Sequence, residues 1–453
     1  MSKLSIVIGV VAGLASMVAM GGPRDNVGDI AVLISDYYYD AQRAATIAGD
    51  LKRDAAAGTF DRFVDPDDLA VELTRRLKPV DAHFNVVWEA AASGVSAAGS
   101  APAGASAGPA AGARSAPRAA SALLRDMQPV PPQDFETVDR RANFGFRRVE
   151  RLPGNIGYIE LVSVANIDFA RADSPARRAA DAALGLVRGA DAVILDLRAN
   201  GGGSPSMVGY LVSAFVAPGK DVFNVFHSRD RSESERPSVP YAEPMLNVPL
   251  YVLTSARTAS AAESIAYTLQ TCGRAQVIGE RSAGAANPGM MFRTPHGFAI
   301  FVSTGAPRNP INGRNWEGEG VQPDTETSDA RALERARVLA LEGVLAGPIA
   351  GLERVDAQWA LDALRASARP FAATHLAGYA GTYGPYAIAV AGGALESKRG
   401  RQPAIVLVPL QKDVFYTEGD PSRHFSFVRT KDRIVALEVR RSRGDGQRFN
   451  RDR

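Results

Sequence analysis

The 453-residue chain has few of the residues that would point to disulfides, metal binding or nucleic-acid binding. Its one cysteine, Cys272, cannot form an internal disulfide, so we interpret it as a core residue and expect packing to supply the stability. The five histidines do not fall in H-E-x-x-H or another zinc spacing, so no catalytic metal is expected. Basic and acidic residues nearly balance, at 52 and 49. This balance argues against a nucleic-acid partner.

A long uncharged apolar run occurs at the N-terminus. Lys3 precedes the run from Leu4 to Met20, and Gly-Gly-Pro follows at residues 21–23. This layout is typical of a secretory signal, so residues 1–22 predict export to the periplasm or the cell exterior. About 20 apolar residues also suffice to cross a bilayer, so an uncleaved membrane anchor stays open.

With 46% hydrophobic residues, the chain can bury a sizeable core in more than one domain. Apolar residues recur at helical spacing from Ile30 to Leu77, and Asp65 is placed to cap one of the helices. This pattern predicts a helical N-terminal domain over residues 24–89. Residues 90–130 are mostly Ala, Ser, Gly and Pro, which predicts a flexible linker.

Short β runs alternate with helical stretches after Phe146, and this alternation predicts a layered α/β core over residues 143–345. The predicted strands include residues 157–164, 191–198, 248–254, 275–280 and 298–305. The predicted helices are 176–188, 207–216, 261–270, 329–345 and 357–367. Further short β runs predict a small β-rich C-terminal domain over residues 370–453. The basic segment from Val439 to Arg453 is expected to be a solvated end.

Ser260 stands between the predicted strand at 248–254 and the predicted helix that starts at Ala261. A hydroxyl there lies at a helix N-terminus, where backbone N–H groups and the helix dipole favour the developing negative charge of acyl transfer. The sequence SAAE at residues 260–263 also fits a capping box, in which the serine only satisfies a backbone donor. Local sequence leaves both interpretations open.

A glycine-rich loop, Asn200-Gly201-Gly202-Gly203, follows the predicted strand at 191–198. Consecutive glycines let the backbone approach a ligand and direct N–H groups at it, as an oxyanion hole requires. A phosphate-binding loop is an alternative, but neither G-x-G-x-x-G nor G-x-x-x-x-G-K-S/T is present. A purely structural turn is the third interpretation.

A nucleophilic serine needs a general base, and His83 is the best placed of the five histidines. It lies in VDAHFNV at residues 80–86, between the helical domain and a β run, from where it could close over a site on the α/β core. A structural histidine is the alternative. The carboxylate that orients the imidazole is best sought in the loop Trp316–Asp324, which could instead be a solvated acidic loop.

These segments occur together with others in one order along the chain. They are DAHFNV at 81–86, NFGFRRVERLPGNIGYIEL at 143–161, DLRANGGGSPSMV at 196–208, LTSARTASAAESIAY at 253–267, GERSAGAANPG at 279–289 and NWEGEGVQPD at 315–324. Jointly they resemble the carboxyl-terminal-processing peptidases, especially the branch that includes the tricorn protease core and interphotoreceptor retinoid-binding protein. The resemblance covers roughly residues 30–341, interrupted by the 90–130 segment.

The resemblance implies a serine-type peptidase with Ser260 as the nucleophile. The backbone amides of Ala261, Gly202 and Gly203 would then form the oxyanion hole. A peptide or protein would be the substrate, and no cofactor is implied. A PDZ domain, which binds substrate C-termini in many members, is not found, so tail specificity has no support.

The resemblance also bears on the general base. Many members use a serine–lysine dyad, but Ala285 stands where the lysine would follow Gly284, which excludes the dyad. The tricorn-like branch instead pairs its serine with a histidine from an upstream helical domain and a glutamate, which correspond to His83 and Glu317. The second serine of that branch would fall at Ala82 and is missing.

The fold that the resemblance implies is the layered spiral α/β core of the ClpP/crotonase superfamily, with a helical N-terminal domain and a small β-rich C-terminal domain. Two other function classes stay open. One is a non-catalytic binding protein for an apolar ligand or a peptide on the same scaffold. The other is an acyl-CoA enzyme, which would need a CoA-phosphate site that we do not identify. The sequence does not indicate an oligomeric state.

Overall fold

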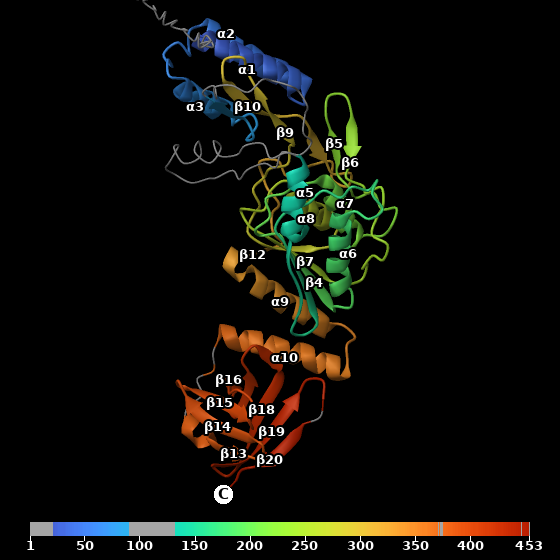
Figure 1. The fold of residues 1–453 in the computed structure, drawn as a ribbon, viewed down its shortest axis with the longest axis vertical. Coiled ribbons are helices and arrows are strands. Elements are labelled where there is room, and N and C mark those ends of the chain that lie inside the picture. The colour runs from blue at the N-terminus through green and yellow to red at the C-terminus, as the bar shows by residue number, and fades with distance from the viewer. Residues whose placement is uncertain (1–20, 90–131, 370, 372–374, 445, 453) are drawn as a thin grey trace, which may run out of the picture. The chain divides into compact units, whose positions relative to one another are not determined.

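The computed structural model describes residues 21–89, 132–369, 371, 375–444 and 446–452. The predicted signal segment up to residue 20 and the predicted linker at 90–130 lie outside the described residues. The chain forms two compact units. The described part of the N-terminal unit contains residues 21–89, 227–232 and 287–306, and the core unit contains the other described residues (Figure 1).

The N-terminal unit is built from three helices and one sheet. The helices are α1 (Pro23–Tyr37), α2 (Ala41–Ala56) and α3 (Pro66–Leu77). The predicted cap is confirmed, because the Asp65 carboxylate accepts the Asp67 N–H at 2.8 Å at the start of α3. The strands β1 (Asn85–Trp88), β10 (Phe298–Ser303) and β9 (Gly289–Arg293) form an antiparallel sheet in that order. The predicted helical N-terminal region is thus present.

Strand β10 lies in a different unit from the one that the sequence indicated. Its run had been assigned to the α/β core, but Val86 of β1 pairs with Ile300 of β10. Phe298, Ile300 and Val302 are buried in the same apolar cluster as the helices of the N-terminal unit. The expected domain boundaries were contiguous in sequence, and this long-range strand pairing breaks that contiguity.

The core unit contains a six-stranded sheet in the order β12-β8-β7-β4-β3-β2. Its strands are β2 (Phe146–Leu152), β3 (Ile156–Leu161), β4 (Ala192–Asp196), β7 (Leu250–Thr254), β8 (Gln276–Gly279) and β12 (Thr325–Glu326). Only the β2–β3 pair is antiparallel, and the other neighbours are parallel. Every residue of β4 and β7 is buried, as expected for parallel strands covered on both faces.

Helices cover both faces of this sheet, which confirms the predicted layered α/β architecture. One face packs against α6 (Pro175–Val187), α7 (Pro205–Ser213) and α8 (Ala261–Thr271). The other packs against α9 (Asp329–Ala346) and α10 (Gly351–Ala368), and α10 starts before the predicted Ala357. The shorter elements are α5 (Pro132–Arg141), η1 (Asn143–Gly145), β5 (Val225–His227), β6 (Ser232–Ser234) and β11 (Ala306–Arg308).

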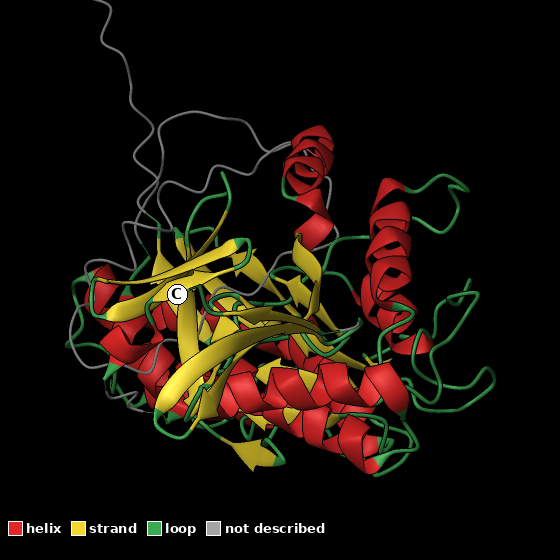
Figure 2. Ribbon diagram, turned by 90° about the horizontal axis from the view of Figure 1, so that it is seen from below, coloured by secondary structure: helices red, strands yellow, loops and turns green. Residues whose placement is uncertain are grey.

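The C-terminal part of the core unit is an eight-stranded antiparallel sheet whose strands follow chain order, after the short η2 (Leu376–Tyr379). The strands are β13 (Gly381–Tyr383), β14 (Tyr386–Ala391), β15 (Ala394–Arg399), β16 (Ile405–Gln411), β17 (Val414–Thr417), β18 (Asp420–Thr430), β19 (Arg433–Arg441) and β20 (Gln447–Asn450). A bridge between Tyr383 and Arg451 joins the first and last strands, so the sheet curls into a barrel (Figures 1 and 2).

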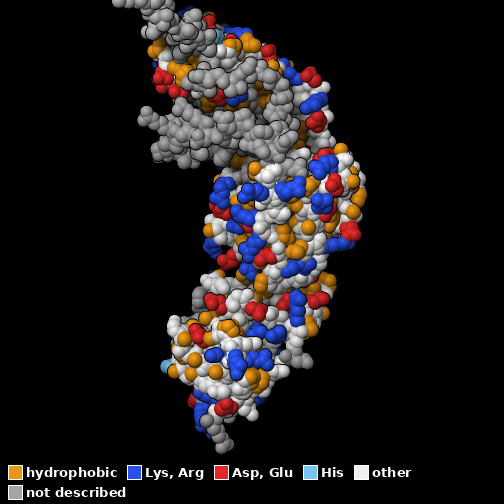
Figure 3. Space-filling view, viewed as in Figure 1, with side chains coloured by type: hydrophobic (Ala, Val, Ile, Leu, Met, Phe, Trp, Pro, Cys, Tyr) orange, Lys and Arg blue, Asp and Glu red, His pale blue; other side chains and the backbone are white. Residues whose placement is uncertain are grey.

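The barrel confirms the predicted β-rich C-terminal domain and corrects one expectation. The segment from Val439 onward was expected to be a solvated end, but its described residues form the last part of β19 and all of β20. Residues of both charge signs are interspersed over the face of the molecule shown in Figure 3. Within the described ranges, the structure has no helix that is both long and apolar enough to span a bilayer.

Candidate active site

Ser260 forms the corner between β7 and α8 in the core unit. Its backbone has φ 53° and ψ −122°, a left-handed conformation that side-chain-bearing residues rarely adopt. Such strained conformations persist where surrounding contacts fix them, and they concentrate at functional sites. Ser260 is half-buried, so the corner presents its side chain toward solvent.

The capping-box interpretation of Ser260 is correct for the backbone and incomplete for the hydroxyl. The Ser260 N–H donates to Oε2 of Glu263 at 2.8 Å, as in the return half of a capping box. The hydroxyl faces the first turn of α8 but makes no cap hydrogen bond of normal geometry with the described residues. The serine oxygen therefore remains available for chemistry.

The glycine loop packs directly against this corner. Gly202 and Gly203 have φ values of +111° and +143°. A Cβ on Gly202 would lie 2.7 Å from the Cβ of Ser260 and 3.1 Å from the Ala261 nitrogen. A glycine is required at this position by both the backbone conformation and the close approach. The structure thus brings together the serine, the glycine loop and the Ala261 amide that the sequence predicted.

The donor expected from Gly202 is already occupied. Its N–H donates to Oδ1 of Asn200 at 2.9 Å. Asn200 is fully buried, and its Nδ2 donates to the Leu161 carbonyl at 3.0 Å. Asn200 therefore fixes the loop. Of the three predicted oxyanion donors, the amides of Gly203 and Ala261 have no side-chain acceptor in the described chain.

A buried carboxylate connects the serine corner to a second loop. Glu263 is fully buried and accepts the Ser260 N–H, the Ser282 hydroxyl at 2.5 Å and the Gly284 N–H at 2.7 Å. It also accepts the Ala285 N–H at 2.8 Å. Burial raises the pKa of Glu263, although these hydrogen bonds oppose the shift.

Glu317 lies in the loop before β12, next to the segment that Glu263 holds. The Ala286 N–H donates to its Oε2 at 2.9 Å, and the Gly318 N–H donates to the Gly284 carbonyl at 2.9 Å. Its half-buried side chain is therefore fixed relative to the loop that follows β8. Ser260 and Glu317 belong to the same unit and are connected through Glu263 and residues 284–286.

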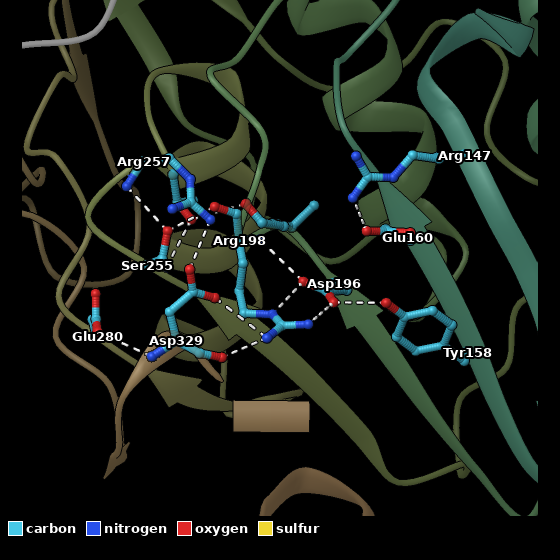
Figure 4. A network of polar contacts seen from close by, with 11 residues as sticks. Arg147, Tyr158, Glu160, Asp196, Arg198, Ser255, Arg257, Glu280 and Asp329 are labelled. Atoms are coloured by element: carbon cyan, nitrogen blue, oxygen red, sulfur yellow. Dashed lines mark hydrogen bonds and ion pairs between the residues drawn. The ribbon is translucent and has the colours of Figure 1, made fainter. Parts of the chain in front are cut away.

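An ion-pair network lies beneath the loops that follow β4 and β7 (Figure 4). Asp196 ends β4, is almost fully buried, and pairs with Arg198 at 2.6 Å. Arg198 also pairs with Asp329 at the start of α9, and Arg257 binds the same carboxylate at 2.7 Å. The Ser255 hydroxyl donates to the Arg198 carbonyl at 2.6 Å. This network ties the segment before Ser260 to the segment before the glycine loop.

His83 belongs to the N-terminal unit, where it follows α3 and precedes β1. Its Nδ1 lies 3.2 Å from Oδ1 of Asp81, and its backbone N–H donates to the same oxygen at 2.9 Å. Asp81 is buried; burial favours a raised pKa for its carboxyl, but the hydrogen bonds from His83 outweigh this effect and the pKa is lowered. A charged Asp81 therefore orients the imidazole within this unit.

Sequence reasoning did not assign a role to Asp81 or to Glu263. The signal for Asp81 was its position two residues before His83, because an aspartate commonly accepts the N–H two residues later in an Asx turn. The signal for Glu263 was the capping box itself. The role predicted for Glu317, orienting His83, stays a prediction.

Comparison with known proteins agrees with the motifs. Residues 155–327 match the model of "Peptidase family S41". This segment contains Ser260, Glu317 and the glycine loop, whereas His83 lies before it. A carboxyl-terminal-processing protease of Picosynechococcus is 29% identical over 140 residues, 30% of this chain and 32% of that protein. The chloroplastic carboxyl-terminal-processing peptidase 1 of Arabidopsis thaliana is 29% identical over 139 residues, 31% of this chain and 28% of that protein.

These alignments confirm the predicted resemblance to the carboxyl-terminal-processing peptidases, and they span about a third of the length of the curated relatives. A solved structure of a photosystem II D1 C-terminal processing protease aligns with a TM-score of 0.32 and 23% identity. The alignment covers 41% of this chain and 46% of that chain.

Proposed function

Because residues 155–327 match peptidase family S41, we propose that the chain is a serine peptidase that cleaves a peptide or protein substrate through Ser260. The main support for the proposal is the conformation of the chain at Ser260. A half-buried serine in a left-handed conformation abuts Gly202 at the start of a helix, and its hydroxyl faces the first turn of α8. A residue that only capped α8 would not need this strained backbone.

In the proposed reaction, the Ser260 Oγ attacks the carbonyl carbon of the scissile peptide bond. His83 takes the hydroxyl proton on Nε2 and later gives it to the leaving amine. This role requires His83, from the N-terminal unit, to reach Ser260. The contact of Nδ1 with the Asp81 carboxylate supports it, because that contact keeps a proton on Nδ1 and leaves Nε2 as the base. Water then hydrolyses the acyl-enzyme.

The negative charge that develops on the substrate oxygen needs donors near the serine. The Ala261 N–H stands at the first position of α8, where the helix dipole also favours an anion. Gly203 supplies the second donor in this proposal. Gly202 contributes mainly by its lack of a side chain, because Asn200 already accepts its N–H. Glu317 would act as an additional carboxylate that orients His83.

The experiment that tests this function is labelling with an active-site serine phosphonate, followed by mapping of the adduct. We expect the adduct on Ser260, and none in Ser260→Ala or His83→Ala. His227→Ala is the matched control, because His227 is an exposed histidine of the same unit whose Nδ1 contacts the Ser232 hydroxyl. Labelling of another residue, or no labelling of folded protein, would favour the non-catalytic binding protein instead.

We also propose that the protein is exported, on the strength of the apolar run from Leu4 to Met20 behind Lys3. A fusion of residues 1–22 to a reporter that is active only outside the cytoplasm should be active. A fusion that carries a charged substitution in the middle of the run should be inactive. Equal activity of the two fusions would contradict export by this segment.

A further inference from the structure

One end of the C-terminal barrel carries arginines at inward-facing strand positions. On β15, Leu395 and Ser397 are 1% and 2% exposed and alternate with more accessible positions, so Arg399, which is exposed, ends the strand on the same side as these two residues. On β18, the inward residues Phe427 and Phe425 lead to Arg423. In an antiparallel meander, the end of β15 and the start of β18 lie at the same end of the barrel.

Two of the arginines at this end lie opposite each other on neighbouring strands. Arg423 pairs in register with Arg441, which ends β19 after the inward residues Leu437 and Val439. Like charges directly opposite on neighbouring strands repel each other. Within the part of the chain that the structure describes, neither arginine has an ion pair with a carboxylate. We call Arg399, Arg423 and Arg441 the arginine rim.

Two carboxylates near this end have other partners. Asp420 accepts the Ser422 N–H and hydroxyl in the turn before the rim. Asp356 of α10 accepts the Ser442 hydroxyl and pairs with Arg443. Neither acid forms an ion pair with Arg399, Arg423 or Arg441 in the described chain.

Buried hydroxyls lie on the inward face at the same end. Ser397, one inward position from Arg399, and Thr417, the last residue of β17, are 2% and 7% exposed. Neither hydroxyl has a hydrogen-bond partner among the described residues. Unsatisfied buried hydroxyls are uncommon in folded proteins, and they often mark a site for a molecule that supplies the missing partner.

The inward face beneath the rim is otherwise apolar and aromatic. Phe425 and Val439 pair with each other directly beside the Arg423–Arg441 pair, and Tyr386 lies opposite Arg399. The Arg399 guanidinium stands 5.6 Å from the centre of the Tyr386 ring. Guanidinium groups therefore stand at this end of the barrel, and buried apolar side chains lie next to them on the same face of the strands.

From this arrangement we propose that the arginine rim binds the carboxylate of a ligand that carries an apolar group next to it. Guanidinium groups present paired N–H donors that match the two oxygens of a carboxylate. Two chemical sources supply such a group, namely the C-terminus of a peptide with an apolar last residue and a free aliphatic acid. The site is separate from Ser260 and does not depend on the proposed peptidase activity.

Calorimetric titration of the full chain tests the proposal. The probes are N-acetylleucine and hexanoate, each with an uncharged counterpart, N-acetylleucinamide and hexanol. We expect at least one acid to bind, and its counterpart to bind at least about tenfold more weakly, because hydrogen bonds to charged partners contribute this much. Binding of N-acetylleucine alone identifies a peptide C-terminus as the source, and binding of hexanoate alone identifies a free acid.

Arginine variants test whether the acid binds at this end of the barrel. Arg423→Gln/Arg441→Gln should weaken binding of the acid at least about tenfold. Arg433→Gln should leave it unchanged, because Arg433 is an exposed arginine at the other end of β19. If the double variant does not fold, the single Arg441→Gln variant should also weaken binding of the acid at least about tenfold. Equal affinity for acids and neutral counterparts, binding that survives both substitutions, or binding of inorganic phosphate alone would overturn the proposal.

Discussion

The backbone N–H of Ser260 donates to the carboxylate of Glu263 across the first turn of α8, at 2.8 Å. The same carboxylate accepts two further backbone N–H groups and one hydroxyl from residues 282–285. One buried acid thus fixes the left-handed corner and the loop that precedes Ala286 and its partner Glu317. The same turn therefore caps α8 and positions the candidate nucleophile.

The first prediction concerns Glu263. Glu263→Gln replaces one acceptor oxygen by an NH₂ group, which cannot accept the N–H and hydroxyl donors that now converge on the carboxylate. We expect the free energy of unfolding to fall by about 1–3 kcal/mol and phosphonate labelling of Ser260 to be lost. Urea denaturation and adduct mapping check this. Unchanged labelling would mean that the corner keeps its shape without the carboxylate.

The strained backbone of Ser260 gives the second prediction. Ser260→Ala and Ser260→Gly both remove the hydroxyl, but only glycine adopts a φ of 53° without steric cost. The glycine variant should therefore be more stable than the alanine variant, by about 1 kcal/mol. Thermal and urea unfolding of the two inactive variants provide the comparison. Equal stability would show that the corner relaxes when the hydroxyl is removed.

A substitution in the glycine loop gives the third prediction. Gly202→Ala would place a Cβ 2.7 Å from the Cβ of Ser260, in a backbone conformation with φ +111°. We expect labelling and peptidase activity to fall about 10²-fold or more. Gly201→Ala is the matched control, because a Cβ there has no atom of the described chain within 4 Å. Equal losses in both variants would indicate general disruption of the loop.

The fourth prediction separates the two carboxylates that could orient His83. If Asp81 has this role, Asp81→Asn should lower kcat about 10²–10⁴-fold with little change in KM, because the imidazole would adopt the wrong tautomer. Glu317→Gln should then have a smaller effect. A larger fall in kcat for Glu317→Gln than for Asp81→Asn would assign the orientation of His83 to Glu317, as the sequence predicted. Steady-state kinetics on one peptide substrate decides between them.

The fifth prediction concerns pH and stability. Burial raises the pKa of Glu235 to about 7, although hydrogen bonds from Ser264 and Asn224 oppose the shift. Between its usual value near 4.5 and about 7, the folded state binds a proton that the unfolded state releases. The contribution of Glu235 to stability is therefore complete below this window and is lost as the pH rises through it.

Glu235→Gln removes this titration while keeping an oxygen acceptor. The substitution should raise the free energy of unfolding relative to the natural chain. This increase should be about 1–3 kcal/mol larger at pH 8 than at pH 5. Urea denaturation at both pH values measures the difference. Glu353→Gln, on the exposed first turn of α10, is the control. A difference that is independent of pH would contradict the assignment.

Local patterns predicted the local structure well. The apolar run before Ser260 and the helix-forming sequence after it predicted the corner, and Asp65 predicted the start of α3. The corner and the cap each have causes that lie within a few residues in the sequence. The position of the glycine loop beside the serine was instead implied by the family resemblance, and the structure has the loop there.

Two of the features that sequence missed depend on contacts between distant segments, and one depends on a turn within a single loop. The run of β10 has the composition of a core strand, and only its pairing with β1 reveals the unit to which it belongs. The Gly202 amide is occupied because Asn200 turns back on its own loop, which composition cannot show. The basic segment after Val439 resembles a tail until its register with β18 is known.

The assignment of residues 287–306 to the N-terminal unit also bears on how the protein can be taken apart. Deleting everything before residue 132 would remove α1, α2, α3 and β1 but leave β9 and β10 behind. The remaining fragment would present Phe298, Ile300 and Val302 without their burial partners and should aggregate. The N-terminal unit therefore cannot be exchanged between homologues as one continuous segment, and chimaeras must carry its three segments together.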